Sequence, residues 1–254
     1  MLSDYRLQDI EKRIDGMRPR SADTMILDVM LLGGTGTGKS TTLNSLLGSE
    51  SANVGHGFEP ETMDISAYKL NKIVRFWDTP GLGDSAEQDK SHAKKIADKL
   101  HESYAMRLSM EEIHEMIHSY NSEEMLNIQL GRKKFGFIDL VLVVIDGSTR
   151  DLGTVYTLFV DVLLPNIQAD RILTVINQCD MAMSGRHWDY SRNVPDSTLL
   201  DFLNDQVRTI TRRISETTGK NIIPPVYYSA EYGYNIERVL DLIIDHIPLE
   251  RRKI

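Results

Sequence analysis

The sequence predicts an α/β protein whose six-stranded, mostly parallel sheet, with one antiparallel strand, lies between two layers of helices. Three observations lead to this prediction. Apolar segments of strand length alternate along the chain with amphipathic segments of helical length, the pattern of a parallel sheet covered on both faces. Two of the apolar segments, 138–146 and 171–177, are almost uninterrupted β-branched and aliphatic runs, as expected of strands buried on both sides. A third, residues 25–32, leads into a glycine-rich loop and then a short helix.

The first half of the chain adds an N-terminal helix, a hairpin and a long insertion. Residues 3–18 carry apolar side chains at helical spacing, so an N-terminal helix is assigned to 1–22, ahead of a main domain at 23–248. Residues 64–70 and 73–78 predict two antiparallel strands joined by a short turn. The strongly charged stretch from about 84 to 136 has helical periodicity and exceeds an ordinary connection, which predicts a helical insertion.

The second half continues the alternation of strands and helices. The predicted elements are a helix around 154–164, a second insertion at 181–195, a helix that ends at Gly219, a strand at 225–229 and a helix at 235–246. Residues 249–254 form a basic tail that is expected to be solvated, with a weak RNA or lipid contact as the alternative. Trp188, inside the second insertion, is interpreted as a packed loop anchor, with partner binding as the alternative.

Composition narrows the class of protein. The 254 residues include 26% charged and 41% hydrophobic side chains, which is ordinary for a globular domain and excludes long disorder. A net charge of −8 gives no general attraction to nucleic acid or acidic lipid. The first residues lack a signal-peptide core and no apolar run could span a bilayer, so a cytoplasmic location is expected. Cys179 is the single cysteine, which excludes an intrachain disulfide and a cysteine-based metal cluster.

The glycine-rich loop is a phosphate-binding motif. Residues 33–40, Gly-Gly-Thr-Gly-Thr-Gly-Lys-Ser, match G-x-x-x-x-G-K-[ST] between a predicted strand and a predicted helix. In such a loop, backbone N–H groups converge on an anion, Lys39 adds a positive charge, and Ser40 offers a hydroxyl to Mg²⁺. The helix N-terminus adds its dipole. The motif predicts binding of a nucleoside triphosphate.

Four further features follow in order along the chain. Asp78-Thr79-Pro80-Gly81 ends a predicted strand, where Asp78 can hold the magnesium shell and the Gly81 N–H can contact the γ-phosphate. Thr62, in the loop expected to close over the phosphates, is the second candidate Mg²⁺ ligand. Asn177-Gln178-Cys179-Asp180 follows a strand, and a carboxylate there can accept both N–H groups of the guanine edge. Ser229-Ala230 can offer a backbone N–H to the guanine carbonyl.

Together these motifs resemble the translation-factor-class (TRAFAC) P-loop GTPases, and among them the Era-like bacterial group often labelled 50S ribosome-binding GTPases. The resemblance covers about residues 27–244 and rests on the order of GGTGTGKS, DTPG, NQCD and SAE. It implies a Ras-like three-layer fold, binding of GTP or GDP with Mg²⁺, and hydrolysis of GTP to GDP and phosphate as a switch. The implied catalytic residues are Lys39, Thr62 and Gly81, and the implied metal ligands are Ser40, Thr62 and Asp78. The implied nucleotide contacts are Gly33, Thr35, Gly36, Thr37, Gly38, Lys39, Ser40, Thr41, Asn177, Gln178, Asp180, Ser229 and Ala230.

Three departures from the family pattern bear on catalysis. Gln178 replaces the lysine that packs on the base, Leu82 replaces the glutamine that orients water in Ras-like enzymes, and Gly36 replaces an asparagine linked to potassium-assisted hydrolysis. Leucine cannot polarise water, so intrinsic turnover should be slow. The missing group is expected from a partner, a second copy of the chain, or a nearby side chain such as Asp84.

Other functions fit the sequence less well. His114-Glu115-Met116-Ile117-His118 matches the H-E-x-x-H helix of zinc proteases, but a charged surface helix inside an insertion is the favoured interpretation. Residues 142–146 resemble the Walker B strand of an ATPase, yet this interpretation leaves Asp78 and Asp180 without a role. A nucleotide-dependent assembly module with incidental hydrolysis stays as the alternative. Partners left open are a homodimer through the nucleotide face or the 84–136 insertion, the ribosome, and a membrane system.

Overall fold

A computed structural model describes residues 8, 12–13, 27–48, 64–69, 74–83, 85–107, 132–149, 151–252 and 254. Its main sheet has six strands, in the spatial order β10 (Val226–Tyr227), β7 (Ile172–Asn177), β6 (Leu140–Asp146), β1 (Leu27–Gly33), β3 (Val74–Asp78) and β2 (Ser66–Lys69). Neighbouring strands are parallel except β2, which is antiparallel to β3. The predicted α/β fold class is therefore confirmed, and the strand limits differ from the prediction by a few residues.

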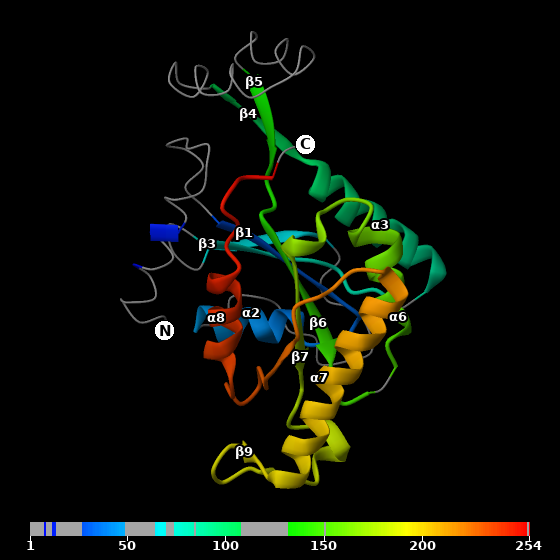
Figure 1. Ribbon diagram of the computed structural model, residues 1–254, viewed down its shortest axis with the longest axis vertical. Helices are drawn as coiled ribbons and strands as arrows, with labels where there is room; N and C mark the ends of the chain where they lie inside the picture. The colour runs from blue at the N-terminus through cyan, green and yellow to red at the C-terminus, as the bar shows by residue number, and fades with distance from the viewer. Residues whose placement is uncertain are drawn as a thin grey trace.

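Helices cover both faces of this sheet (Figure 1). They are α2 (Lys39–Leu47), α3 (Ala86–His101), α6 (Gly153–Thr157) with its π-helical continuation η1 (Leu158–Leu163), α7 (Ser197–Thr218) and α8 (Ile236–Asp245), with short 3₁₀ turns η2 (Ala169–Arg171) and η3 (Ala182–Gly185). One apolar core joins α2 and α8 to the sheet, and a second joins α3, α6, η1 and α7 to the opposite face. None of the helices in the described ranges is long and apolar enough to cross a membrane.

The predicted helix ends have clear local causes. The Asp196 side chain caps α7 by accepting a hydrogen bond from the Leu199 N–H at 2.9 Å. The same helix ends at Gly219, as predicted, where φ is 65°, a left-handed conformation that glycine adopts without strain. In α8 the side chains of Val239, Leu240 and Ile243 face the core, so the amphipathic spacing read from the sequence corresponds to real burial.

The predicted helical insertion at 84–136 is only partly helical. Its start forms α3, but β4 (Ser103–Arg107) and β5 (Arg132–Gly136) pair as antiparallel strands. In Figure 1 this pair lies at one end of the long axis, and the pair of β8 (Trp188–Asp189) and β9 (Val194–Pro195) lies at the other. β4 and β5 are separated along the chain by residues 108–131, so their pairing is a tertiary interaction that local helical periodicity does not reveal. Residues 108–131, with the H-E-x-x-H match at 114–118, lie outside the described residues.

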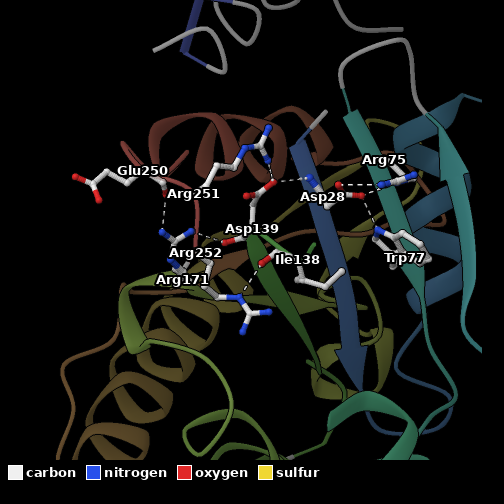
Figure 2. Close-up of polar contacts among 9 residues, drawn as sticks. All are labelled: Asp28, Arg75, Trp77, Ile138, Asp139, Arg171, Glu250, Arg251 and Arg252. Carbon is white, nitrogen blue, oxygen red and sulfur yellow. Dashed lines mark hydrogen bonds and ion pairs between the residues drawn. The ribbon is translucent and has the colours of Figure 1, made fainter. Parts of the chain in front are cut away.

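Two arginines of the predicted basic tail at 249–254 are buried, which corrects the sequence interpretation of a solvated tail at these positions. Arg251 and Arg252 are only 4% and 3% exposed. Figure 2 shows Arg251 directed at the Asp139 carboxylate, where its Nη1 donates to Oδ2. Arg252 donates to the carbonyls of Ile138 at 3.2 Å, Asn166 at 3.0 Å and Leu100. A guanidinium has five donors, and satisfying them with carbonyls lets an arginine be buried where charge alone predicts exposure.

The remaining predicted segments are described in part. Of the N-terminal helix at 1–22, only residues 8, 12 and 13 are described, and Arg13 Nη1 donates to the Ile244 carbonyl at 2.9 Å. The second insertion, 181–195, contains η3 and a small hairpin of β8 (Trp188–Asp189) and β9 (Val194–Pro195). Trp188 is 5% exposed and meets Tyr234 edge to face, with ring centroids 5.1 Å apart. Its interpretation as a packed anchor is confirmed.

Candidate nucleotide-binding site

The glycine-rich loop lies between the carboxyl end of β1 and the start of α2, as the motif predicts. Gly36 and Gly38 have φ values of 76° and 83°, so the loop curls through left-handed turns before the helix begins. A Cβ on Gly38 would lie 2.3 Å from Asn177 Nδ2, so the loop and the base motif pack without room for a side chain. This curl at a helix N-terminus is the arrangement that binds phosphate.

Lys39 is buried against the loop that it follows. Its side chain is 7% exposed, and Nζ donates to the Gly34 carbonyl at 2.8 Å and the Gly33 carbonyl at 3.3 Å. The ammonium is thus fixed beside the loop backbone, at the place where the phosphates are expected. The position agrees with its predicted role of adding positive charge to the phosphate site.

Two of the predicted magnesium ligands lie together. The Ser40 hydroxyl donates to Asp78 Oδ2 at 2.8 Å. The other carboxylate oxygen of Asp78 accepts from the Thr79 N–H at 3.0 Å, which orients the 1% exposed carboxylate. A hydroxyl and a carboxylate are the hard oxygen donors that Mg²⁺ prefers, so these residues fit that ion. Thr62, the third predicted ligand, lies outside the described residues.

The base-binding loops are joined to the phosphate-binding loop through Asn177. Its Nδ2 donates to the Thr37 carbonyl at 3.0 Å, and its Oδ1 accepts from the Ala230 N–H at 3.0 Å. Asn177 is 2% exposed, so this bridge is shielded from water. The structure therefore brings the three predicted motifs, which are far apart in sequence, to one edge of the sheet.

Asp180 has the properties expected of a base reader. It is 4% exposed, and its Oδ1 is buried without a hydrogen-bond partner among the described residues. A buried carboxylate oxygen left unpaired is unfavourable, and a ligand that donates N–H groups would satisfy it. The guanine edge presents such donors. The neighbouring Cys179 is also buried, which raises the pKa of its thiol, so it stays protonated at neutral pH.

Gln178 also contacts the phosphate-binding loop. Its backbone adopts a positive φ of 59°, and its side-chain Nε2 donates to the Gly36 carbonyl at 2.8 Å. The glutamine that replaces the family lysine therefore ties the base motif to the loop by a direct hydrogen bond.

Leu82, which stands where Ras-like enzymes have glutamine, is turned away from the site. Its side chain is 5% exposed and packs in the core beneath α3 and α6. Its backbone lies against the phosphate-binding loop, because Thr35 N donates to Leu82 O at 2.8 Å and Leu82 N donates to Gly33 O at 3.3 Å. Asp84, the alternative source of a catalytic group, lies outside the described residues.

Several residues that contact the site lie outside the sequence motifs. The Tyr228 hydroxyl lies 2.6 Å from Thr42 Oγ1 and so joins the segment directly after β10 to α2, and burial raises the pKa of Tyr228. His92 on α3 contacts the Gly81 carbonyl, and Asp89 accepts from the Gly83 N–H at 2.8 Å. Local spacing cannot identify these residues, because their partners are set by the tertiary fold.

Comparison with known structures supports the fold. Toc33 from Arabidopsis thaliana, in complex with GDP and Mg²⁺, superposes with a TM-score of 0.59 at 16% identity, covering 98% of this chain and 93% of Toc33. Era from Aquifex aeolicus, bound to GDP and AlF₄⁻, gives a TM-score of 0.53 at 17% identity, covering 88% of this chain and 57% of Era. Both show a Ras-like GTPase fold.

Sequence comparison points to the same family. The tRNA modification GTPase MnmE of Porphyromonas gingivalis (strain ATCC BAA-308 / W83) is 28% identical over 141 residues, which are 55% of this chain and 23% of that relative. The chain thus spans about a quarter of MnmE. The family model of the 50S ribosome-binding GTPases matches residues 28–178, more than half of the 254 residues. The chain therefore belongs to the family of 50S ribosome-binding GTPases.

Proposed function

We propose that the protein is a GTP-driven switch with slow intrinsic turnover, whose hydrolytic site is completed by a second copy of the chain. The observation that carries this proposal is the burial of Leu82, which points into the core and leaves no side chain at that position to orient water. In Ras-like enzymes a glutamine at this position orients the attacking water, which is one of the parts that hydrolysis requires.

The residues that would act on the nucleotide each have a defined task. Ser40 and Asp78 would hold Mg²⁺, with Thr62 as the further ligand that the sequence predicts. When bound, Mg²⁺ neutralises charge that develops on the phosphates. Lys39 adds a second positive charge, the Gly81 N–H contacts the γ-phosphate, and Asp180 accepts the N–H groups of guanine. Hydrolysis removes the γ-phosphate contact and releases the segment that follows Gly81.

A second copy is the favoured source of the missing group because of one structural neighbour. A crystal structure of Toc33 contains a dimerization-deficient mutant of that protein. It covers all of this chain with a TM-score of 0.60 at 14% identity. In this proposal the surfaces are the nucleotide face or the region 84–136, and the setting is the cytoplasm. Era has been crystallised with a segment of 16S ribosomal RNA, so a ribosomal activator is the competing arrangement.

The test is the rate of GTP hydrolysis per molecule as a function of protein concentration. A specific rate that rises with concentration supports completion of the site by a second copy. A flat, slow rate that rises on addition of ribosomes supports the ribosomal arrangement and contradicts the dimer. A flat, fast rate would contradict slow intrinsic turnover. Slow hydrolysis with assembly that depends on bound GTP would favour the assembly module.

A further inference from the structure

The peptide unit between Gly81 and Leu82 is held from both sides. Its N–H, from Leu82, donates to the Gly33 carbonyl at 3.3 Å, and its carbonyl, from Gly81, lies 2.9 Å from His92 Nδ1. The next carbonyl, that of Leu82, accepts from Thr35 N at 2.8 Å. The segment after the DTPG motif is therefore joined both to the phosphate-binding loop and to α3.

The packing around Gly81 leaves no room for a side chain. A Cβ built there would lie 2.4 Å from Thr35 Oγ1, 2.6 Å from Thr35 Cα and 2.7 Å from Thr35 N. Glycine is thus required by contact, but glycine also has the most permissive backbone, so nothing in the residue itself keeps its peptides in one orientation. That orientation must come from hydrogen bonds to its neighbours.

His92 is the side chain that supplies this restraint. It is 4% exposed and lies on α3, eleven residues beyond Gly81. A carbonyl oxygen can only accept, so Nδ1 carries the proton and donates. Asp89, one turn earlier on α3, accepts from the Gly83 N–H at 2.8 Å, so the helix holds the segment at two points. His92 approaches Gly81 from the interior and does not face solvent.

We propose that His92 is a positioning residue for GTP hydrolysis. By fixing the Gly81–Leu82 peptide, it sets the direction of the adjoining Gly81 N–H toward the γ-phosphate, and it makes α3 move with that segment. His92 acts through Gly81 and does not touch the nucleotide. The inference rests on the proposed contact of Gly81 with the γ-phosphate. GDP lacks that phosphate, so binding of GDP should not depend on His92.

The experiment compares three variants of the full chain. His92→Leu removes the donor, and His92→Asn keeps an amide N–H at the same number of bonds from Cα as Nδ1. His246→Leu is the matched control, because His246 Nδ1 makes the same kind of bond, 2.8 Å from the Leu242 carbonyl, at the C-terminal end of α8 and away from the site. The measurements are kcat and KM for GTP, the Kd values for GDP and a non-hydrolysable GTP analogue, and the thermal midpoint.

His92→Leu is expected to lower kcat about tenfold or more, a loss of the size seen when a residue that orients a metal ligand is removed. It should also reduce the preference for the GTP analogue over GDP by about fivefold or more, with the Kd for GDP within about twofold of wild type. His92→Asn should recover most of both losses, and His246→Leu should show neither, whatever its effect on the thermal midpoint.

Two results would overturn the proposal. One is a His92→Leu protein with wild-type kcat and unchanged analogue preference. The other is a loss of GDP affinity as large as the loss of kcat, which indicates a purely structural role. If the wild type hydrolyses no GTP at any concentration, the proposed switch fails on its own. The preference for the analogue over GDP then still decides whether His92 positions Gly81.

Discussion

Asp180 is the residue on which base specificity is expected to depend. Its buried, unpaired Oδ1 suits the N–H donors of guanine. Asp180→Asn presents an amide N–H at this point, so it should weaken GTP binding about 100-fold or more, since a site built for one hydrogen-bond pattern rejects the wrong one strongly. The variant should gain binding of xanthosine triphosphate, whose base accepts where guanine donates. Fluorescent-nucleotide titration measures both affinities.

A carboxylate on the surface of α7 provides the control for this change. Asp205 lies 3.4 Å from Arg208 in an exposed ion pair, so Asp205→Asn should leave both affinities unchanged. Unaltered GTP binding by Asp180→Asn would show that another group reads the base.

Gly38 allows a second prediction, because the chain contains a matched glycine. Gly38 and Gly48 both have left-handed φ values, 83° and 67°, but a Cβ on Gly38 meets Asn177 Nδ2 at 2.3 Å, whereas one on Gly48 meets nothing within 4 Å. Gly48→Ala should therefore cost only about 1 kcal/mol of backbone strain. Gly38→Ala should in addition separate the phosphate-binding loop from Asn177 and abolish nucleotide binding.

Isothermal titration with GDP and thermal melting of both variants measure these effects. Equal nucleotide affinity in the two proteins would mean that the contact between the loop and Asn177 is not needed for binding.

How far the site could be predicted depends on where the signal lies in the sequence. Lys39, Ser40 and Asp180 lie in contiguous motifs whose residue types state their chemistry. His92 and Tyr228 belong to no motif, and the 2.6 Å contact of Tyr228 with Thr42 joins residues 186 positions apart. Such pairs exist only after the sheet has formed, so no local pattern contains them. The roles assigned to Thr62 and Gly81 stay predictions.

The loop between β7 and α7 is stabilised by one aromatic anchor. Trp188 is 5% exposed, packs with Leu199 and Leu203 of α7, and meets the Tyr234 ring. Trp188→Ala should lower the free energy of unfolding by about 3 kcal/mol, the usual effect of removing a buried aromatic side chain. Chemical denaturation followed by circular dichroism measures it.

Tyr190 in the same loop is 55% exposed and serves as the comparison. Tyr190→Ala should change stability by less than about 0.5 kcal/mol, as most surface substitutions do. Similar losses in both variants would contradict the view that Trp188 alone anchors the loop.

Helices and strands differed in how well the sequence predicted them. α7 and α8 carry long amphipathic stripes and clear ends, and both formed as expected. The β4–β5 pair was missed, because its strands are stabilised by each other and by burial of Phe135, which is fully buried. The helix predicted at 154–164 is present, but its second half is π-helical, and hydrophobic spacing does not distinguish that winding from an α-helix.

The buried charges at the amino end of the sheet should make stability depend on pH. Burial raises the pKa of Asp139 to about 6, although Arg251 opposes the shift. Because the folded pKa exceeds the unfolded one, this carboxyl contributes most stability below about pH 4, and the contribution is lost as pH rises through 6. The change should be at most about 3 kcal/mol.

The measurement is the free energy of unfolding between pH 4 and 7.5, for the wild type and Asp139→Asn. The difference between the two proteins isolates this group, because all other titrating residues are shared. Asp139→Asn stays neutral at every pH, so it should lack the decline around pH 6 that the wild type shows. A parallel pH profile for both proteins would show that Asp139 does not titrate in this range.

The arrangement of the whole molecule followed from the alternation of strands and helices, but the end of the chain did not. Six strand-like segments with helices between them have few acceptable topologies, so the fold class could be predicted. Arg251 and Arg252 looked like a solvated tail because composition carries no information about acceptors. The buried carbonyls of Ile138 and Asn166 and the Asp139 carboxylate become available only after the chain has folded (Figure 2).

The burial of Leu82 also limits how far a single substitution at this position can raise the rate of GTP hydrolysis. Restoring the Ras-like glutamine, Leu82→Gln, would place an amide in the buried apolar cluster that also contains Ile96 and Leu158, where water does not reach it. The expected result is a protein less stable by about 2 kcal/mol or more, with no faster hydrolysis. A substitution at position 82 alone should therefore not make hydrolysis faster. Selection for faster hydrolysis would have to act on another surface of this protein or on another molecule.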